Sequence, residues 1–508
     1  MSPPLTIART GAFALWVRIT ANVYEKARLE ASFLFCRFAM VTAMPFNSAE
    51  TISPAPVADA ELAAALDRIA QLAASCETQT AAQASAQKPS RFTPAEPASF
   101  HDAGLTDSEV ESLILKFLLA RGDAVGRDIA EQVKLSFMPV EQLLRELKYS
   151  QLIVHRGSAP MNDFVYQLTD LGRERARRLS LHCTYFGAAP VSLEDYVASV
   201  RAQSLVGQHP TPDDLSRAFG GLLLSRRMLD KLGPAINSGR GLFLFGPPGN
   251  GKSSIAERIT AAFGREIWIP RAIAVDGEIL RIYDPMNHEE APLEENAGLL
   301  DQRKIDKRWI RIRRPTIVAG GELTMSQLDV TTNPATGVSE APLQMKSNCG
   351  TLVIDDFGRQ RMSIHELLNR WIVPLEKRYD YLNMANGKKI EVPFDQLVVF
   401  STNLEPRELV DEAFLRRIPY KIEVGDPDES EFRQLFEIMG RRLGVAHRPA
   451  AVDYLIVTHY KAAGRAFRFC HPRDLLLQIH NFCKYHDHSP EMTPEHFDRA
   501  VENYFAVM

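Results

Sequence analysis

The chain has 508 residues, of which 45% are hydrophobic and 24% are charged, a composition typical of a folded protein with several domains. Its 59 Lys and Arg residues against 63 Asp and Glu residues give a formal net charge of −4, which excludes a protein whose whole surface is basic. Six cysteines without a CxxC pair exclude a disulfide scaffold. Because no run of about 18 uncharged apolar residues occurs, we expect no membrane span and a cytoplasmic protein.

The first 104 residues are expected to form an arm to which we assign no function. Residues 11–40 are apolar but interrupted by charges, so they do not make the continuous core of a signal peptide, and Met40 and Met44 are alternative translation starts. Residues 45–104 are rich in Ala, Pro, Ser and Gln and bury too little to offset their chain entropy. Apart from one short helix expected at 58–74, we predict a disordered arm or an over-extended translation start.

Residues 105–180 are predicted to form a small domain. Thr106 and Glu109 make a capping-box pattern before an apolar helical face. Three helices and two short strands are expected, at about 106–121, 126–134, 139–150, 152–157 and 163–170, and a further helix at 171–179 closes the domain. Three helices followed by a two-stranded wing resemble a winged helix-turn-helix domain.

The charges of this domain bear on its partner. Basic and acidic residues are equal in number over 105–180, and the third helix carries Glu141 and Glu146 beside Arg145 and Lys148. The two glutamates weaken the attraction to DNA phosphates. Docking of a protein partner is therefore favoured, and reading of DNA is the alternative.

A nucleotide-binding motif begins at residue 246. The apolar strand Gly241–Phe245 leads into Gly246-Pro-Pro-Gly-Asn-Gly-Lys-Ser253, which fits GxxxxGK[ST] in full, and an apolar helix follows. Backbone N–H groups of such a loop wrap the phosphates of ATP, Lys252 neutralises the β and γ oxygens, and the Ser253 hydroxyl takes a place on Mg²⁺. The expected ATP-binding residues are Gly246, Pro247, Pro248, Gly249, Asn250, Gly251, Lys252, Ser253 and Ser254.

Polar residues follow two further apolar strands. Asp355 and Asp356 come directly after the strand that starts at Thr351, an arrangement in which one acid holds the metal and its neighbour orients the attacking water. Asp355 is the expected Mg²⁺ residue and Asp356 the expected catalytic residue. The strand that starts at Leu397 ends at the polar Asn403.

These motifs, in this order over about residues 216–508, resemble the AAA+ ATPase family. The resemblance implies a doubly wound parallel α/β sheet, a C-terminal helical lid, and a ring of identical subunits, hexameric in the family, that works at subunit interfaces. Asn403 looks like the sensor 1 residue, and a turn-forming asparagine is the alternative. Most members of the family have Glu at the position of Asp356, and Asp occurs there in some active relatives, so this departure bears on the rate of hydrolysis and does not exclude hydrolysis.

Two arginine roles also come from this resemblance. Arg417, and next to it Arg416, resemble the arginine finger that reaches the γ-phosphate of the neighbouring subunit; the alternative is an ordinary helix end, where cations suit the dipole. Arg473 resembles the sensor 2 arginine of the lid, with Arg465 and Arg468 as weaker candidates.

Residues 367–403 look like the MoxR-like branch of this family. There a helix is followed by a β-hairpin, expected here near Leu382–Val392 with an Asn386-Gly387 turn, just before the sensor 1 strand. No aromatic–hydrophobic–Gly pore loop is recognised.

The stretch between the two nucleotide motifs, about 265–350, is longer than a simple βα unit requires. Within it Trp309, Arg311 and Arg313 share one face of an expected strand and could contact nucleic acid. The favoured alternative is a strand face that pairs with the acidic run before it or lines a subunit contact.

A zinc site in the C-terminal tail is a further, weaker alternative. The residues that suggest it lack a compact paired-ligand spacing, so buried thiols and surface histidines are favoured. They are Cys470, His471, His480, Cys483, His486 and His488.

The sequence therefore predicts an AAA+ ATPase that hydrolyses ATP at subunit interfaces to remodel a protein client recruited by the winged-helix-like domain. A DNA-binding regulator whose assembly ATP controls, and a nucleotide-gated scaffold with little hydrolysis, are the alternatives. The expected divisions are an arm at 1–104, the winged-helix-like domain at 105–180, a linker at 181–215, the nucleotide-binding core at 216–426 with its insert at about 265–350, and the lid at 427–508.

Overall fold

A computed structural model describes residues 92–292, 305–410 and 412–506. The helix expected at 58–74 and most of the expected arm lie outside these described residues. Folded structure begins before the boundary expected at 105, because Phe92 packs edge-on against Trp309 at 5.5 Å between ring centroids and Phe100 is buried.

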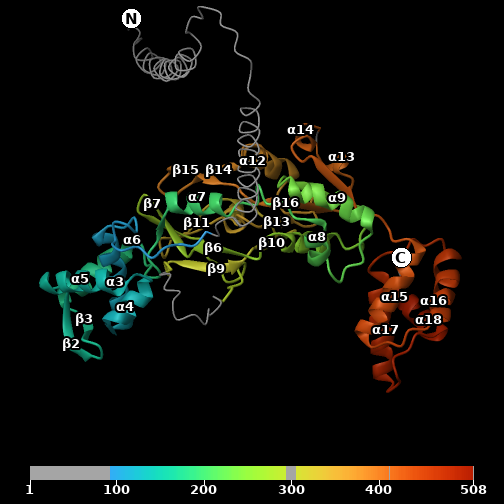
Figure 1. Cartoon of the computed structure of the whole chain (residues 1–508), viewed down its shortest axis with the longest axis horizontal. Coiled ribbons are helices and arrows are strands. Elements are labelled where there is room, and N and C mark those ends of the chain that lie inside the picture. Colours follow the sequence, from blue (N-terminus) through green and yellow to red (C-terminus); the bar gives the residue numbers. More distant parts are fainter. Residues whose placement is uncertain (1–91, 293–304, 411, 507–508) are drawn as a thin grey trace, which may run out of the picture. The chain divides into compact units, whose positions relative to one another are not determined.

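The winged-helix-like unit has its helices and strands in the expected order (teal in Figure 1). Thr106 and Glu109 form the capping box at the start of its first helix. Its three strands form an antiparallel sheet in the order β1-β3-β2, one strand more than expected. The elements are α3 (Asp107–Arg121), β1 (Asp123–Val125), α4 (Gly126–Val133), α5 (Phe137–Tyr149), β2 (Ile153–Ala159), β3 (Asp163–Leu168) and α6 (Asp170–His182).

The core sheet has five parallel strands in the order β10-β13-β16-β5-β17. Alternate residues of its strands enter opposite cores: Leu242 and Leu244 pack in one apolar cluster and Phe243 in the other. Helices therefore cover both faces, and the expected doubly wound α/β fold is confirmed. The strands are β10 (Thr316–Ala319), β13 (Thr351–Ile354), β16 (Leu397–Thr402), β5 (Leu242–Phe245) and β17 (Tyr420–Glu423), and the helical segments are α8 (Pro212–Ala218), α9 (Arg226–Asn237), α10 (Lys252–Arg258), η1 (Ile259–Ala262), α12 (Ile364–Lys377), α13 (Pro406–Leu409) and α14 (Glu412–Leu415).

A second sheet has the strand order β11-β12-β8-β7-β4. Its strands come from the expected linker at 181–215 and from the expected insert at about 265–350. The expected linker supplies β4 and α7, whose Tyr196 is fully buried in the cluster beneath this sheet. The expected insert supplies the other strands, but its strand β10 belongs to the core sheet. The elements are β4 (Val191–Ser192), α7 (Leu193–Ala202), β7 (Ala272–Val275), β8 (Glu278–Arg281), η2 (Met325–Leu328), β11 (Thr331–Asn333), β12 (Val338–Glu340) and α11 (Leu343–Lys346), with the antiparallel pair β6 (Glu266–Pro270) and β9 (Trp309–Arg313) beside them in the same cluster.

The expected hairpin is present as β14 (Tyr379–Asn383) and β15 (Lys389–Pro393). Gly387 has φ of +80°, the left-handed conformation of the glycine that ends a three-residue hairpin loop, and its amide donates to the Met384 carbonyl oxygen at 2.9 Å. The hairpin is not free: the amide of Asn386 donates to a Glu278 carboxylate oxygen at 2.8 Å, and Lys388 pairs with Asp276 at 2.7 Å. Its tip is thus fastened to the turn between β7 and β8.

The C-terminal tail is helical, as expected for a lid (red in Figure 1). Its apolar faces meet in a single cluster around Phe432, Phe436 and Tyr460. The elements are α15 (Glu429–Leu443), α16 (Pro449–Leu455), η3 (Ile456–Lys461), α17 (His471–Tyr485) and α18 (Pro494–Tyr504). Among the helices in the described part of the chain, none is long and apolar enough to cross a membrane.

Candidate nucleotide-binding site

The P-loop, residues 246–253, connects the carboxyl end of β5 to the start of α10. Its glycines serve the turn: Gly246 has φ of +135°, and a Cβ there would lie 2.5 Å from the Val424 carbonyl oxygen. Gly251 precedes α10 at φ +80°. The strand, turn and helix therefore follow one another as the motif predicts.

Lys252 lies in this loop with its ammonium group directed at oxygen atoms. Its Nζ donates to the carbonyl oxygens of Gly246 and Pro247, both at 2.9 Å, and to Asn403 Oδ1 at 2.6 Å. Burial lowers the pKa of Lys252, and the carboxylates of Asp355 and Asp356 oppose this shift. The contact with Asn403 places the end of β16 beside the P-loop, so the polar residue after this strand is at the site.

The end of β13 brings two carboxylates to the same edge of the sheet. The Ser253 hydroxyl donates to Asp355 Oδ2 at 2.8 Å, and Asn403 Nδ2 lies 3.4 Å from Asp356 Oδ1. A hydroxyl and a carboxylate in contact provide the hard oxygen ligands that Mg²⁺ takes. Ser253 and Asp355 therefore fit the metal positions expected of them, and Asp356 lies beside Asn403.

Asp356 has an unusual backbone conformation. Its φ is +47°, which L-amino acids with a Cβ rarely adopt, and its side chain is exposed. Its amide donates to Asp355 Oδ1 at 3.1 Å. The turn that follows β13 thus directs two successive carboxylates away from the sheet.

The remaining loop residues differ in exposure. Pro248 and Gly249 are exposed to solvent, Ser254 is half-buried, and Asn250 is only 3% exposed. A Cβ at Gly249 would lie 2.5 Å from the Sγ of Cys470, so the lid packs directly on the loop.

The two candidate finger arginines directly follow α14. Arg417 Nε is 3.4 Å from a Glu376 carboxylate oxygen on α12. Arg416 is exposed and lines a hollow of about 500 Å³ together with Arg407, Val410, Glu412, Leu415 and Lys421. Of the two, Arg416 is the more exposed.

The lid arginines lie in different surroundings. Arg473 pairs with its neighbour Asp474, at 2.8 Å. Arg465 lies over the ring of Phe505 at 4.3 Å. Arg468 pairs with Asp426, which also accepts a hydrogen bond from Asn250 of the P-loop at 2.7 Å. Arg468, a weaker candidate from sequence, is therefore the arginine that the structure brings to the P-loop.

Asp426 also belongs to this site, although its sequence context does not indicate it. It follows β17 in a Gly-Asp-Pro segment and belongs to no motif that was recognised. Only the three-dimensional contact with Asn250 and Arg468 identifies it as part of the site.

The basic strand β9 is engaged within the protein. Trp309 is buried, Arg311 pairs with Glu266, and Arg313 pairs with Glu289 of the preceding acidic run at 2.9 Å. These contacts agree with the favoured alternative of a strand face that pairs with the acidic run.

No group of three or more His, Cys, Asp or Glu side chains within the described ranges is arranged to hold a metal ion. Of the zinc candidates, Cys483 is buried, and His471 is buried and bonds the Tyr460 hydroxyl at 2.9 Å. Cys483 is thus a buried thiol, as favoured from the sequence, whereas His471 is buried and is not the surface histidine that was expected.

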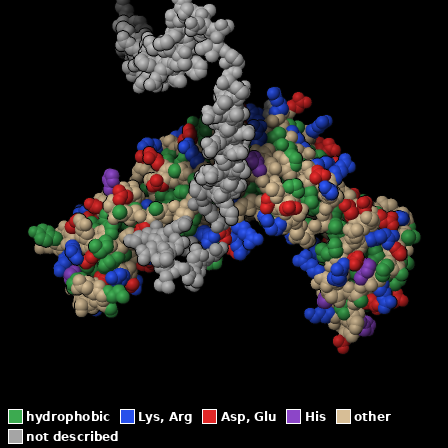
Figure 2. All heavy atoms as spheres, viewed as in Figure 1, with side chains coloured by type: hydrophobic (Ala, Val, Ile, Leu, Met, Phe, Trp, Pro, Cys, Tyr) green, Lys and Arg blue, Asp and Glu red, His purple; other side chains and the backbone are tan. Residues whose placement is uncertain are grey.

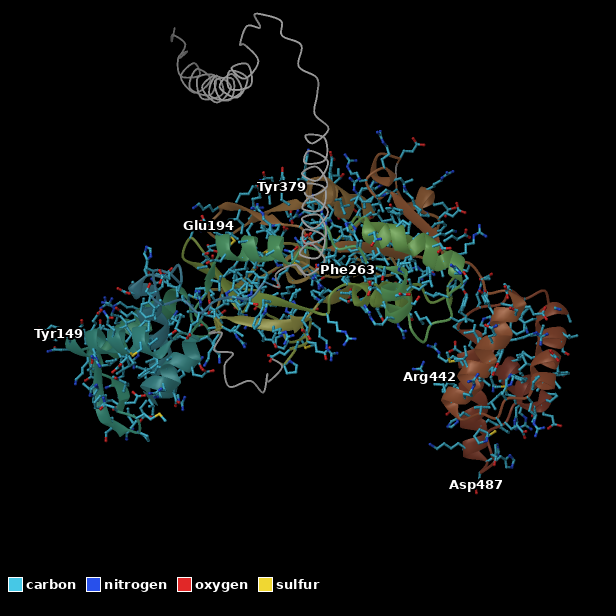
Figure 3. All side chains as sticks on the ribbon, in the orientation of Figure 1. Tyr149, Glu194, Phe263, Tyr379, Arg442 and Asp487 are labelled. Carbon is cyan, nitrogen blue, oxygen red and sulfur yellow. The ribbon has the colours of Figure 1, made fainter. Side chains whose placement is uncertain are left out.

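The surface of the winged-helix-like unit is mixed. Figure 2 shows apolar side chains and charges of both signs interspersed over it, and Figure 3 shows Tyr149 projecting from the end of α5, where its side chain is 92% exposed. On α5, Arg145 pairs with Glu141 at 2.6 Å. Met138 on the same helix is also exposed, so part of the surface of α5 is apolar.

Comparisons with known proteins cover only parts of this chain. A family model described as "Domain of unknown function (DUF8689)" matches residues 428–503, and no match is found among curated proteins. Similar solved structures include NtrX from Brucella abortus in complex with ADP (13% identity, 57% of this chain and 56% of that chain covered, TM-score 0.36). A RuvB mutant from Thermotoga maritima (12%, 56% and 71%, 0.32) and the FIGL-1 AAA domain (16%, 52% and 70%, 0.29) are also similar. The chain thus covers little more than half of NtrX.

Proposed function

We propose that this chain is an AAA+ ATPase that binds Mg-ATP at the P-loop and hydrolyses it at subunit interfaces to remodel a protein client. The observation that carries the proposal is the convergence of three strand ends on one site. Lys252 contacts Asn403, and Ser253 contacts Asp355, across β5, β16 and β13. Glycine-rich turns of this kind bind phosphate through backbone N–H groups and the N-terminus of the helix that follows.

Each side chain has a distinct task in this proposal. The Lys252 ammonium group exchanges its carbonyl contacts for the β and γ oxygens of ATP. Ser253 and Asp355 would hold Mg²⁺, which supplies charge neutralisation to the phosphates. Asp356 accepts the proton of the attacking water, and Asn403, 3.4 Å from it, orients that water.

Subunit contact completes the site. Arg416, with Arg417 beside it, would stabilise the charge on the γ-phosphate of a neighbouring subunit, because an arginine supplied in this way stabilises the transition state. A ring of identical subunits follows from this arrangement, and the winged-helix-like unit with its exposed Tyr149 would recruit the client. The ion pair between Arg145 and Glu141 makes DNA the less favoured partner of this unit.

Steady-state ATP hydrolysis by the full chain, measured across a range of protein concentrations, tests the proposal. Specific activity should rise with concentration, fall below detection in Lys252→Ala, and drop at least tenfold in Arg416→Ala. Arg442→Ala, which removes an exposed arginine of α15, is the matched control and should retain activity. Activity that is independent of concentration and unaffected by Arg416→Ala would refute hydrolysis at a subunit interface.

A second candidate function, a nucleotide-gated scaffold with little hydrolysis, is favoured by Asp356. This carboxylate is one methylene shorter than glutamate, and Asp356 itself has a left-handed backbone conformation at φ +47°. Tight ATP binding with negligible turnover, together with a large gain of turnover in Asp356→Glu, would establish the scaffold. Normal turnover in the wild-type chain would exclude it.

A further inference from the structure

The side chain of Asn250 joins the P-loop to the lid through both ends of its amide. Its Nδ2 donates to Asp426 Oδ1 at 2.7 Å, and its Oδ1 accepts from the backbone amide of Phe469 at 3.3 Å. The residue is only 3% exposed, so water cannot satisfy its side-chain amide. These two hydrogen bonds satisfy it instead. A P-loop side chain is thus bonded both to the segment that enters the lid and to the segment that precedes α17.

Asp426 has a second partner in the lid, the guanidinium of Arg468. The two side chains are partly buried, at 35% and 24% exposure, so this pair is less screened by solvent than an exposed one. One more bond runs beside it, from the amide of Cys470 to the carbonyl oxygen of Gly249 at 2.9 Å. We call Asn250, Asp426 and Arg468, together with the Phe469 amide, the lid clip.

The lid clip places a positive charge near the phosphate cradle. The charge of Arg468 acts on Lys252, whose pKa it lowers in addition to the larger effect of burial. A group close enough to act on the P-loop ammonium is also close enough to act on phosphates bound there. Arg468 is, however, already paired with Asp426, so a phosphate must compete with a carboxylate for the same guanidinium.

We infer that Asp426 competes with the terminal phosphate of ATP for Arg468: it pairs with Arg468 beside the P-loop, and Arg468 exchanges Asp426 for that phosphate when ATP binds, while Asn250 keeps the lid segment on the loop. The inference rests on the proposed function and adds to it a role for the Asp426 carboxylate: its pairing with Arg468 sets how readily this lid arginine contacts the bound nucleotide. A purely structural Asp426 would affect ATP and ADP equally. A competitor for Arg468 affects the nucleotide with the additional phosphate more.

The first test measures the Kd of the full chain for Mg-ATP and for Mg-ADP in Asp426→Asn. Asparagine keeps an oxygen that accepts from Asn250 Nδ2 but removes the charge that holds Arg468. ATP should bind on the order of tenfold more tightly, the gain expected when one charge-assisted contact loses its competitor, and ADP should change much less. Adding Arg468→Ala to Asp426→Asn should remove the gain.

Glu423→Gln is the matched control, because it removes a carboxylate three residues earlier that is exposed on β17. Its Kd values should equal those of the wild type. The inference is overturned if Asp426→Asn leaves the ratio of the two Kd values unchanged, if it weakens ATP binding, or if its gain persists without Arg468.

A second test needs no nucleotide. Hydrogen exchange of the Phe469 and Cys470 amides should accelerate in Asn250→Ala, while the amide of Ile479, inside α17, keeps its protection. Unchanged exchange at Phe469 and Cys470 would overturn the lid clip itself. Failure of the wild-type chain to bind ATP would instead overturn the proposed function, so the two failures are distinguishable.

Discussion

The buried ion pair between Arg308 and Asp306 gives the sharpest stability prediction. Both side chains are about 3–4% exposed, and two guanidinium nitrogens, Nε and Nη2, contact the carboxylate at 2.8 to 3.1 Å. The same guanidinium donates to the carbonyl oxygens of Ala103 and Pro190, at 2.8 and 3.1 Å. One side chain therefore connects β9 with the start of the winged-helix-like unit and with the segment that leads to β4.

Arg308→Met leaves Asp306 as an uncompensated buried charge, which costs about 3–5 kcal/mol of unfolding free energy. The double variant Asp306→Leu, Arg308→Met removes both charges but leaves two carbonyls without their donor and the backbone amide of residue 308 without its acceptor, at about 1 kcal/mol each. It should therefore lose about 3 kcal/mol, less than Arg308→Met, in which the same two carbonyls are unpaired in addition to the buried charge. Urea unfolding followed by tryptophan fluorescence measures these losses, because Trp309 follows Arg308 directly in the chain.

Lys307→Met is the control, since Lys307 is 61% exposed and its pair with Glu131 lies at the surface. It should cost less than about 1 kcal/mol. If Arg308→Met costs no more than Lys307→Met, or if the double variant is less stable than Arg308→Met, the reasoning is wrong.

Three further predictions concern the lid and the P-loop. Burial lowers the pKa of His471 to about 4 from an ordinary 6.5, so the stability that neutral His471 contributes is complete above pH 6.5 and is lost as the pH falls toward 4. The unfolding free energy should therefore be about 2–3 kcal/mol lower at pH 4.5 than at pH 7, and His471→Gln should lack this loss. Gly249→Ala, at φ +82°, should lower stability by about 1–2 kcal/mol from the backbone alone. A Cβ there also meets Cys470, so Cys470→Ala should restore part of the loss in a melting experiment, and no recovery would contradict the contact. Ser253→Ala should raise the Mg²⁺ concentration needed for half-maximal hydrolysis, while an unchanged requirement would remove Ser253 from the metal site.

The sequence predicted the parts of the fold whose cause is local. The order of strand, glycine turn and helix around Lys252 and the Asn-Gly hairpin turn at Gly387 were both predictable, because each depends on residues adjacent in the chain. The doubly wound sheet was predicted from the family resemblance, and its continuous apolar strands fit a sheet that is buried on both faces.

Long-range pairing could not be predicted in the same way. The short strand β4 pairs with β7 about eighty residues later, so nothing near Val191 distinguishes it from a linker. Strand β10 looked like part of the insert because its neighbour in the sheet, β13, is distant in the chain. Arg468 and Asp426 are likewise brought together only by the folded lid.

The apolar cluster beneath the second sheet has a consequence for how the chain folds as it is synthesised. Its buried residues begin at Val191 and end at Val392, and the hairpin closes it last. Roughly 110 residues lie between the end of β8 and Val392, which at about 5–20 residues per second corresponds to about 6–22 s of synthesis. During that time the apolar sides of β7 and β8 are without their final cover. Folding of this part should therefore depend on chaperones that bind exposed apolar strands, and halting synthesis before Val392 should yield an aggregation-prone intermediate.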